Sequence, residues 1–162
     1  MKLSLTRSLC LAMLLSLWLA PALSAQTATK KVLTLEAAKK IAAAAEAEAR
    51  KNQWNVAITI VDDGGNLIYL ERMDGTQIAS IDISQFKAHG AIGFKRPTKE
   101  HQDLIAGGST NILRMPWSAP VEGGLPLVIG GEFVGAIGVS GVTGPQDSLV
   151  AAAGAAATAT MK

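Results

Sequence analysis

The chain has 162 residues, 49% of them hydrophobic and 17% charged, and its formal charge of +2 comes from 15 basic and 13 acidic residues. Both excess positive charges, Lys2 and Arg7, lie near the N-terminus, so the rest of the chain is neutral and has no electrostatic footprint for nucleic acid or an anionic membrane. One cysteine and two histidines also exclude a disulfide framework and a structural zinc site.

The N-terminal segment has the three parts of a secretory signal peptide. Lys2 and Arg7 form a positive region, residues 9–19 form an almost wholly apolar core, and small residues follow Pro21 up to Ala25. The apolar core is too short to span the roughly 30 Å of hydrocarbon in a bilayer. We therefore predict a signal peptide over residues 1–25 that is cleaved near Ala25. The mature chain of 137 residues is expected to be periplasmic or secreted, with no membrane contact after cleavage.

The mature chain begins with a polar lead over residues 26–32, followed by a predicted helix over residues 35–51. This stretch is rich in Ala, Glu, Lys and Arg, which are good helix formers. Its apolar positions recur every three or four residues and form one stripe of mostly small side chains, which permits close approach to a sheet or another helix. Thr34 is expected to cap the start of the helix, and Asn52 to end it.

A β-hairpin and two further helices are expected next. Residues 55–61 and 67–73 are the predicted strands, and the sequence between them supplies the Asp, Gly and Asn residues of a tight turn. Residues 80–94 predict a helix that is weakened by Gly90 and Gly93. Its candidate buried positions are Ile81, Ile83, Phe86, Ala88 and Ile92. A short helix, capped by Thr98, is expected to run through Ile105.

The segment over residues 107–124 is irregular and long for a small domain, and such loops are often functional. A second hairpin follows, with strands over residues 125–129 and 133–139. Both strands are almost wholly apolar and are expected to be central and covered on both faces. Pro145 is well placed at the start of a last, alanine-rich helix over residues 146–160.

The order of these elements predicts an α/β (α+β) fold. Two hairpins give an antiparallel sheet of about four to five strands, covered by helices. No internal linker is apparent, so residues 33–160 are expected to form a single domain.

Several segments of the predicted domain resemble one family. They are LTLEAA at 33–38, IVDDGGNL at 60–67 with RMDG at 72–75, Lys87-Ala88 with FKRPT at 94–98, and GGLPL at 123–127 running into GAIGVSG at 135–141. Their order and spacing resemble the GlcG/HbpS haem-binding family, also seen as the C-terminal domain of PduO-type proteins. The resemblance implies a small profilin-like domain that assembles into dimers and higher oligomers and that binds haem in characterised relatives.

Haem binding requires an apolar slot, a partner for the propionates and usually an axial ligand such as His or Met. His89 is the favoured ligand, because it lies beside Gly90, where a flat group can approach the helix closely. The family's pattern has a small residue or threonine at this position, so His89 departs from it. His101, beside Glu100 in a short polar helix, is a second candidate that is expected to be exposed.

The other candidates lie on or near the irregular segment. Guanidinium groups suit carboxylates, so Arg96 and Arg114 are candidate propionate partners. The resemblance implies an oxygen ligand near Thr110 or Ser118 in other members, and Met115 and Met73 are sulfur ligands that are expected to pack instead. Trp117 can stack on a ring or close the core. The predicted cofactor-binding set is His89, Arg96, Thr110, Arg114, Met115 and Trp117, with His89 as the metal ligand.

Three other chemistries are disfavoured. Residues 138–141 do not form a nucleophile elbow, because Val142 holds the place of the final glycine. The glycines before the last helix lack a phosphate-loop lysine, and the turn at 62–66 lacks the remaining calcium ligands. The sequence predicts an exported, oligomeric, non-catalytic haem-binding protein for storage, sensing or protection. The alternatives are an accessory subunit or enzyme of an oxidative pathway that binds a small organic substrate, and a self-assembling module without a ligand.

Overall fold

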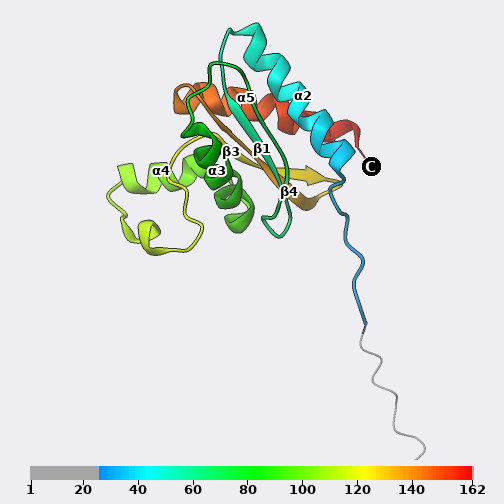
Figure 1. The fold of residues 1–162 in the computed structure, drawn as a ribbon. Coiled ribbons are helices and arrows are strands. Elements are labelled where there is room, and N and C mark those ends of the chain that lie inside the picture. Colours follow the sequence, from blue (N-terminus) through cyan, green and yellow to red (C-terminus); the bar gives the residue numbers. More distant parts are fainter. Residues whose placement is uncertain (1–25, 162) are drawn as a thin grey trace, which may run out of the picture. The chain divides into compact units, whose positions relative to one another are not determined.

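The computed structural model describes residues 26–161, so the predicted signal peptide lies outside the described residues. The elements follow in the order α2 (Leu35–Lys51), β1 (Ala57–Asp62), β2 (Leu67–Arg72), α3 (Ser80–Phe94), α4 (Thr98–Ala106), the 3-10 helix η2 (Asn111–Arg114), β3 (Gly124–Ile129), β4 (Glu132–Ser140), α5 (Gly144–Ala156) and the 3-10 helix η3 (Ala157–Thr160) (Figure 1). The predicted α+β fold is confirmed, and α2 and α3 have the predicted bounds.

The four strands form one antiparallel sheet in the order β2-β1-β4-β3. β1 and β4 are therefore central, and β4 is buried along most of its length, as expected. The expectation that both strands of the second hairpin are central is wrong for β3, which lies at an edge. Pro126 fits this position, because an edge strand tolerates a residue without a backbone N–H.

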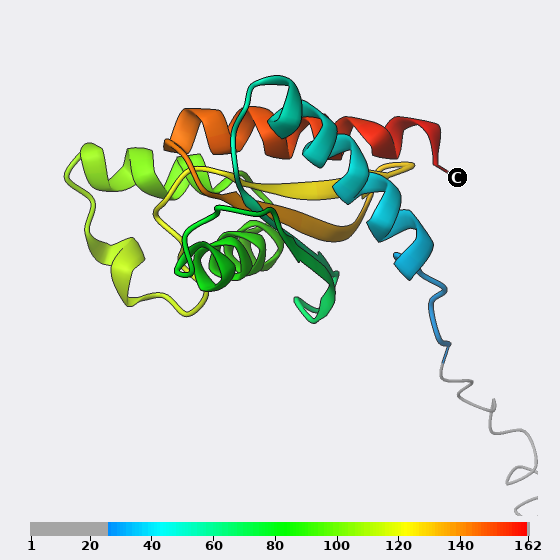
Figure 2. The ribbon, with the colours of Figure 1, turned by 45° about the horizontal axis from the view of Figure 1, so that its top comes forward.

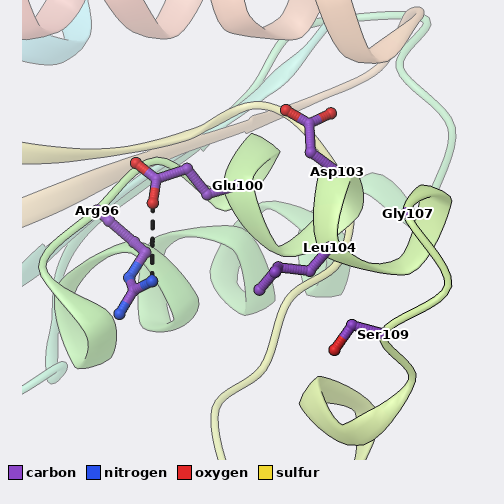
Figure 3. Close-up of a pocket in the computed structure, with 6 residues that line it drawn as sticks. All are labelled: Arg96, Glu100, Asp103, Leu104, Gly107 and Ser109. Atoms are coloured by element: carbon purple, nitrogen blue, oxygen red, sulfur yellow. Dashed lines mark ion pairs between the residues drawn. The ribbon is translucent and has the colours of Figure 1, made fainter.

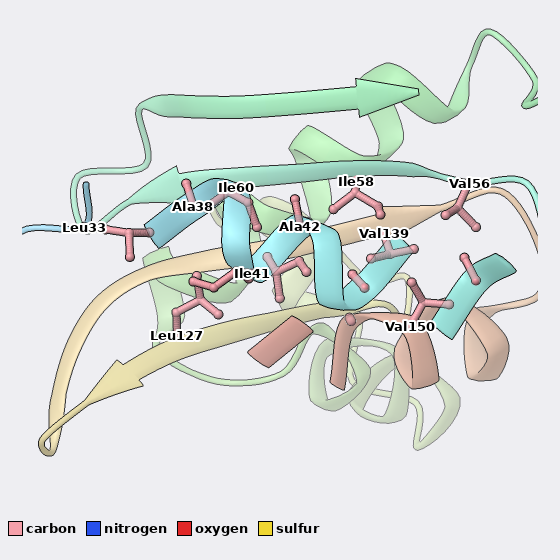
Figure 4. Close-up of a cluster of buried hydrophobic side chains, with 14 of the residues drawn as sticks. Leu33, Ala38, Ile41, Ala42, Val56, Ile58, Ile60, Leu127, Val139 and Val150 are labelled. Atoms are coloured by element: carbon pink, nitrogen blue, oxygen red, sulfur yellow. The ribbon is translucent and has the colours of Figure 1, made fainter. Parts of the chain in front are cut away.

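Helices cover both faces of the sheet. α2 and α5 lie side by side on one face, and α3 lies on the other (Figure 2). The alanine stripe of α2 and the apolar side chains of β1, β3, β4 and α5 that face it are fully or almost fully buried (Figure 4). Thr34 caps α2 as predicted, by accepting a hydrogen bond from the Ala37 N–H at 3.2 Å. Small side chains on α2 allow close contact with both α5 and the sheet.

The buried side of α3 differs from the predicted one. Ala88 and Ile92 are buried as expected, but Ile83 and Phe86 are exposed, and Ser84 and Lys87 take buried positions instead. The hydroxyl oxygens of Thr59 on β1 and Ser84 lie 2.7 Å apart and form a hydrogen bond. Apart from Lys87, α3 turns mostly small and hydroxyl-bearing residues to the sheet, because the helix lies so close to Gly138 of β4 that a Cβ there would overlap the Ser84 carbonyl.

None of the helices in the part of the chain that the structure describes is both long and apolar enough to cross a membrane.

Candidate functional site

A pocket of about 420 Å³ opens beside α4 (Figure 3). Its lining residues are Arg96, Glu100, Asp103, Leu104, Gly107 and Ser109. The volume falls in the range of small-molecule sites. Arg96 Nη1 is 3.7 Å from Glu100 Oε2, and its guanidinium lies 5.7 Å from the centre of the Phe94 ring. Of the predicted cofactor-binding set, the pocket contains only Arg96, and that side chain already has an acidic partner.

The structure brings two other members of the predicted set together. His89 lies half-buried on α3, and its ring stacks on the indole of Trp117 with the ring centres 5.7 Å apart and the planes inclined by 27°. Neither side chain has a hydrogen-bond partner among residues 26–161. Both imidazole nitrogens of His89 are therefore available, within this part of the chain, to a ligand.

Two glycines form the floor under the indole of Trp117. A Cβ at Gly65, in the β1–β2 turn, would lie 3.0 Å from the indole, and a Cβ at Gly93, near the end of α3, would overlap it. Gly65 has a φ of +81°, so the turn itself requires glycine there. Gly93 has no such requirement and costs the helix roughly 1 kcal/mol relative to alanine. The indole explains why residue 93 is glycine, because a side chain there would occupy the place of the ring. We call the flat surface that Gly65 and Gly93 form under the indole the seat.

The backbone of Trp117 is strained. Its φ is +67°, in the left-handed region that costs an L-amino acid about 1–2 kcal/mol. The side chain is nevertheless 47% exposed, so only part of the indole surface is removed from water. The contacts that keep the ring on its seat are therefore offset in part by the backbone cost.

The open approach that was expected beside His89 is absent. A Cβ at Gly90 would lie 2.5 Å from Ala119 Cβ and 3.0 Å from the Trp117 carbonyl oxygen, so the segment around these residues covers this part of α3. The expectation that a flat group can approach at Gly90 is wrong. The indole fills the accessible space beside His89, and Trp117 stacks on the imidazole in addition to covering the glycines.

The remaining predicted residues are not gathered at His89. Thr110, Arg114 and Met115 are exposed on the segment around η2, and Arg114 forms no ion pair within the described part of the chain. Ser118 is buried, and its hydroxyl has no hydrogen-bond partner among the described residues. Met73 packs against the main core, as expected, but the same expectation is wrong for Met115, whose side chain is 48% exposed on the irregular segment.

His101 is completely buried, so the expectation that it is exposed is wrong. Its Nδ1 accepts a hydrogen bond from the Ala119 N–H at 3.4 Å, and the Phe94 ring packs edge-on against it at 4.5 Å. Burial lowers the pKa of His101 below its usual 6.5, and the charge of Arg96 acts in the same direction. A neutral imidazole whose Nδ1 accepts has its proton on Nε2. His101 therefore holds Ala119, and with it the segment behind Trp117, against α4.

A buried ion pair, which the sequence did not predict, connects α3 to α5. Lys87 Nζ donates to Asp147 Oδ2 at 2.7 Å and to the Val139 carbonyl at 2.8 Å, and the two charged side chains are 1% and 3% exposed. Burial lowers the pKa of Lys87 and raises that of Asp147, while the hydrogen bond between them opposes both shifts. Lys87 is the only lysine or arginine of α3, and that was the available signal.

Gly123 and Gly124 close over this ion pair. A Cβ at Gly123, where φ is +120°, would lie 2.8 Å from both Lys87 Nζ and Asp147 Cβ. A Cβ at Gly124 would overlap the Lys87 carbonyl. The backbone of β3 can therefore lie directly on the ion pair and exclude water from it. The pair joins α3 to α5 with both side chains almost fully buried, which gives it a structural role.

The residues at the seat fit a flat macrocycle with a metal at its centre on two conditions. The glycine floor accepts a flat aromatic ring, and an imidazole stands beside it. The indole must leave for the macrocycle to enter, and the imidazole, whose plane is inclined by only 27° to the indole, must turn so that a ring nitrogen points at the metal. Within residues 26–161 no cluster of three or more His, Cys, Asp or Glu side chains is placed to bind a bare metal ion.

Comparison with known proteins gives one consistent result. A family model described as "Haem degrading protein HbpS-like" matches residues 33–156. The chain is 44% identical over 112 residues to Protein GlcG of Escherichia coli K12, covering 69% of this chain and 84% of GlcG. The crystal structure of a Streptomyces reticuli HbpS double mutant is similar, with a TM-score of 0.75, 35% identity, and coverage of 83% of this chain and 92% of that one. A PduOC:heme complex has a TM-score of 0.72 and 26% identity, covering 78% of this chain and 95% of that one.

Proposed function

Because this chain belongs to the HbpS-like family, we propose that it is an exported, oligomeric haem-binding protein that serves haem storage, sensing or protection without a catalytic step of its own. The family is haem-related, and one similar structure is a complex with haem. The observation that carries the proposal for this chain is the seat of Gly65 and Gly93 beside His89. It holds a flat aromatic ring against an imidazole with no other partner in the described residues.

Each nearby group has a place in this proposal. His89 would hold the haem through an imidazole nitrogen, and the haem would supply the iron that accepts it. The glycines of the seat let the macrocycle lie close to the backbone. Arg114, which forms no ion pair in the described part of the chain, is a partner for a propionate. Phe86, one turn before His89 on α3, adds exposed apolar surface next to the imidazole.

Titration with ferric haem tests this proposal. We expect saturable binding with a shifted Soret band, and we expect His89→Ala to weaken binding about tenfold or more, because the imidazole that would hold the iron is removed. Gln85→Ala, on the preceding turn of α3, is the matched control and is expected to leave the spectrum unchanged. No saturable shift at micromolar haem would reject the proposal, and an unchanged spectrum in His89→Ala would exclude His89 as the ligand.

The haem-bound protein also distinguishes simple binding from the alternative that the chain is an enzyme. When the complex is incubated with a reductant and O₂, its Soret absorbance is expected to persist. Progressive loss of that absorbance with release of iron, faster than for free haem, would show turnover and contradict the non-catalytic part of the proposal.

Export and assembly are tested together by expressing the full chain in a bacterium and recovering it outside the cytoplasm. The pattern of residues 1–25 supports cleavage near Ala25, so the intact mass is expected to correspond to a chain that begins at Gln26.

Exposed apolar side chains such as Ile78 (77%) and Leu149 (58%) support self-association. Light scattering is expected to give a dimer or larger. An uncleaved chain in the cytoplasm, or a monomer at tens of micromolar, would contradict the corresponding part.

A further inference from the structure

The ring of Trp117 and a macrocycle on the same face of His89 exclude each other. The imidazole and indole centres are 5.7 Å apart. A flat group inserted between them needs about 3.5 Å on each side, the distance at which carbon atoms make contact. The present separation is too small by more than an ångström. A ligand that reaches His89 from this side must therefore take the place that the indole now has.

The indole can move without its backbone segment moving. Ala119 is fully buried against Gly90, and its N–H is held by His101. Trp117 itself has a half-exposed ring with no hydrogen bond among residues 26–161. The segment is thus fixed two residues away, while rotation of one side chain into solvent opens the seat.

We propose that Trp117 is the gate of the His89 site: its indole occupies the seat on Gly65 and Gly93 in the free protein and swings out when haem enters. This inference rests on the proposed haem-binding function, because haem is the entering ligand. It makes Trp117 a residue that controls entry rather than one that contributes affinity. The apparent affinity and association rate are reduced by the small fraction of molecules with an open seat.

Stopped-flow association of ferric haem tests the gate. Trp117→Ala is expected to raise the association rate and the affinity about fivefold or more, because the seat is then always open. Trp117→Gly, which also relieves the left-handed backbone, is expected to do the same and guards against misfolding of the alanine variant. Slower or weaker binding by both variants would mean that the indole contacts the bound haem, and unchanged rates would mean that it does not obstruct entry. Either result overturns the gate.

Gly93→Ala tests whether the indole and the macrocycle use the same seat, because its Cβ would overlap a ring placed there. It is expected to slow haem association in the Trp117→Ala background, where the seat is otherwise open. Unchanged association in that background would mean that haem does not enter the seat and would overturn the proposal. Gly107→Ala is the matched control, since its φ is −79° and its Cβ meets nothing closer than 3.4 Å.

Fluorescence of the ligand-free protein reports the ring directly. In a Trp18→Phe, Trp54→Phe background, Trp117 is the only tryptophan. Gly93→Ala is expected to shift its emission to longer wavelength and make it easier to quench with acrylamide. No change would overturn the seated position of the ring. If no variant binds haem at all, the haem-binding function is rejected. If all bind with equal rates, the gate alone is rejected.

Discussion

Replacing Lys87 by methionine is expected to lower the free energy of unfolding by about 3–5 kcal/mol at neutral pH. The substitution keeps most of the side-chain volume but removes the cation that faces Asp147 at 2.7 Å. The carboxylate then stays buried under Gly123 without its partner. Urea denaturation of the purified protein measures the change, and a loss below about 1 kcal/mol would contradict the structural role of the pair.

The size of this loss is expected to depend on pH, in a direction that follows from linkage. Burial already raises the pKa of Asp147, and removing Lys87 raises it further. The folded variant therefore binds a proton at acid pH that the unfolded chain, with an ordinary carboxyl pKa of 3.8, does not bind. The penalty should shrink as the pH falls towards 4 and grow as the pH rises. A penalty that is the same at pH 4.5 and pH 7 would contradict a buried, unpaired carboxylate.

An exposed ion pair serves as the control for Lys87→Met. Lys99 Nζ is 2.7 Å from Asp103 Oδ2, the same distance as in the buried pair, but both of these side chains are more than half exposed. Lys99→Met is expected to change the free energy of unfolding by less than about 1 kcal/mol, since exposed pairs contribute little. The comparison isolates burial as the cause.

Gly138→Ala is expected to cost about 3 kcal/mol, near the upper end of the range for overpacking. Gly138 lies on β4 directly under α3. A Cβ there would overlap the Ser84 carbonyl and lie 2.6 Å from the Ala88 nitrogen. Both obstacles are helix backbone and cannot rotate away as a side chain would, so α3 must move off the sheet.

Thermal or urea denaturation measures the effect of Gly138→Ala, and Gly107→Ala is again the matched control. The control position has room for a methyl group and is expected to stay within about 0.5 kcal/mol of the wild type. Equal stability of the two variants would mean that α3 and β4 are not packed as closely as the structure places them. Since the seat under Trp117 includes Gly93 of α3, a shifted helix is also expected to disturb the site.

Local features of the sequence were sufficient to predict most of the helices and strands. The Thr34 cap and the alanine stripe predicted α2, and the Asp62–Asn66 turn predicted the first hairpin. Both signals act between residues close together in the chain, where propensity, capping and turn chemistry operate. The face that α3 turns to the sheet was predicted wrongly for Ile83 and Phe86. Which face is buried depends on the partner surface, and here that surface consists of glycine and small residues on distant strands.

The candidate site was predicted only in part, because its residues come from segments that are far apart in the chain. His89 and Trp117 were both selected from the sequence, and the structure stacks them on each other. Their contact joins α3 to the irregular segment, and no spacing in the sequence shows that Gly65 lies beneath the same ring. The burial of His101 was missed, because a polar neighbour such as Glu100 says nothing about the opposite face of a short helix.

The order of elements, the antiparallel hairpins and the family resemblance are properties that the sequence by itself determined, since each depends on short segments and their spacing. The tertiary structure alone decided that β3 is an edge strand, that Lys87 meets Asp147, and that an indole covers His89. Each of these depends on contacts between residues far apart in the chain, and such contacts exist only once the helices have packed on both faces of the sheet. The gate proposed at His89 depends on the last of them.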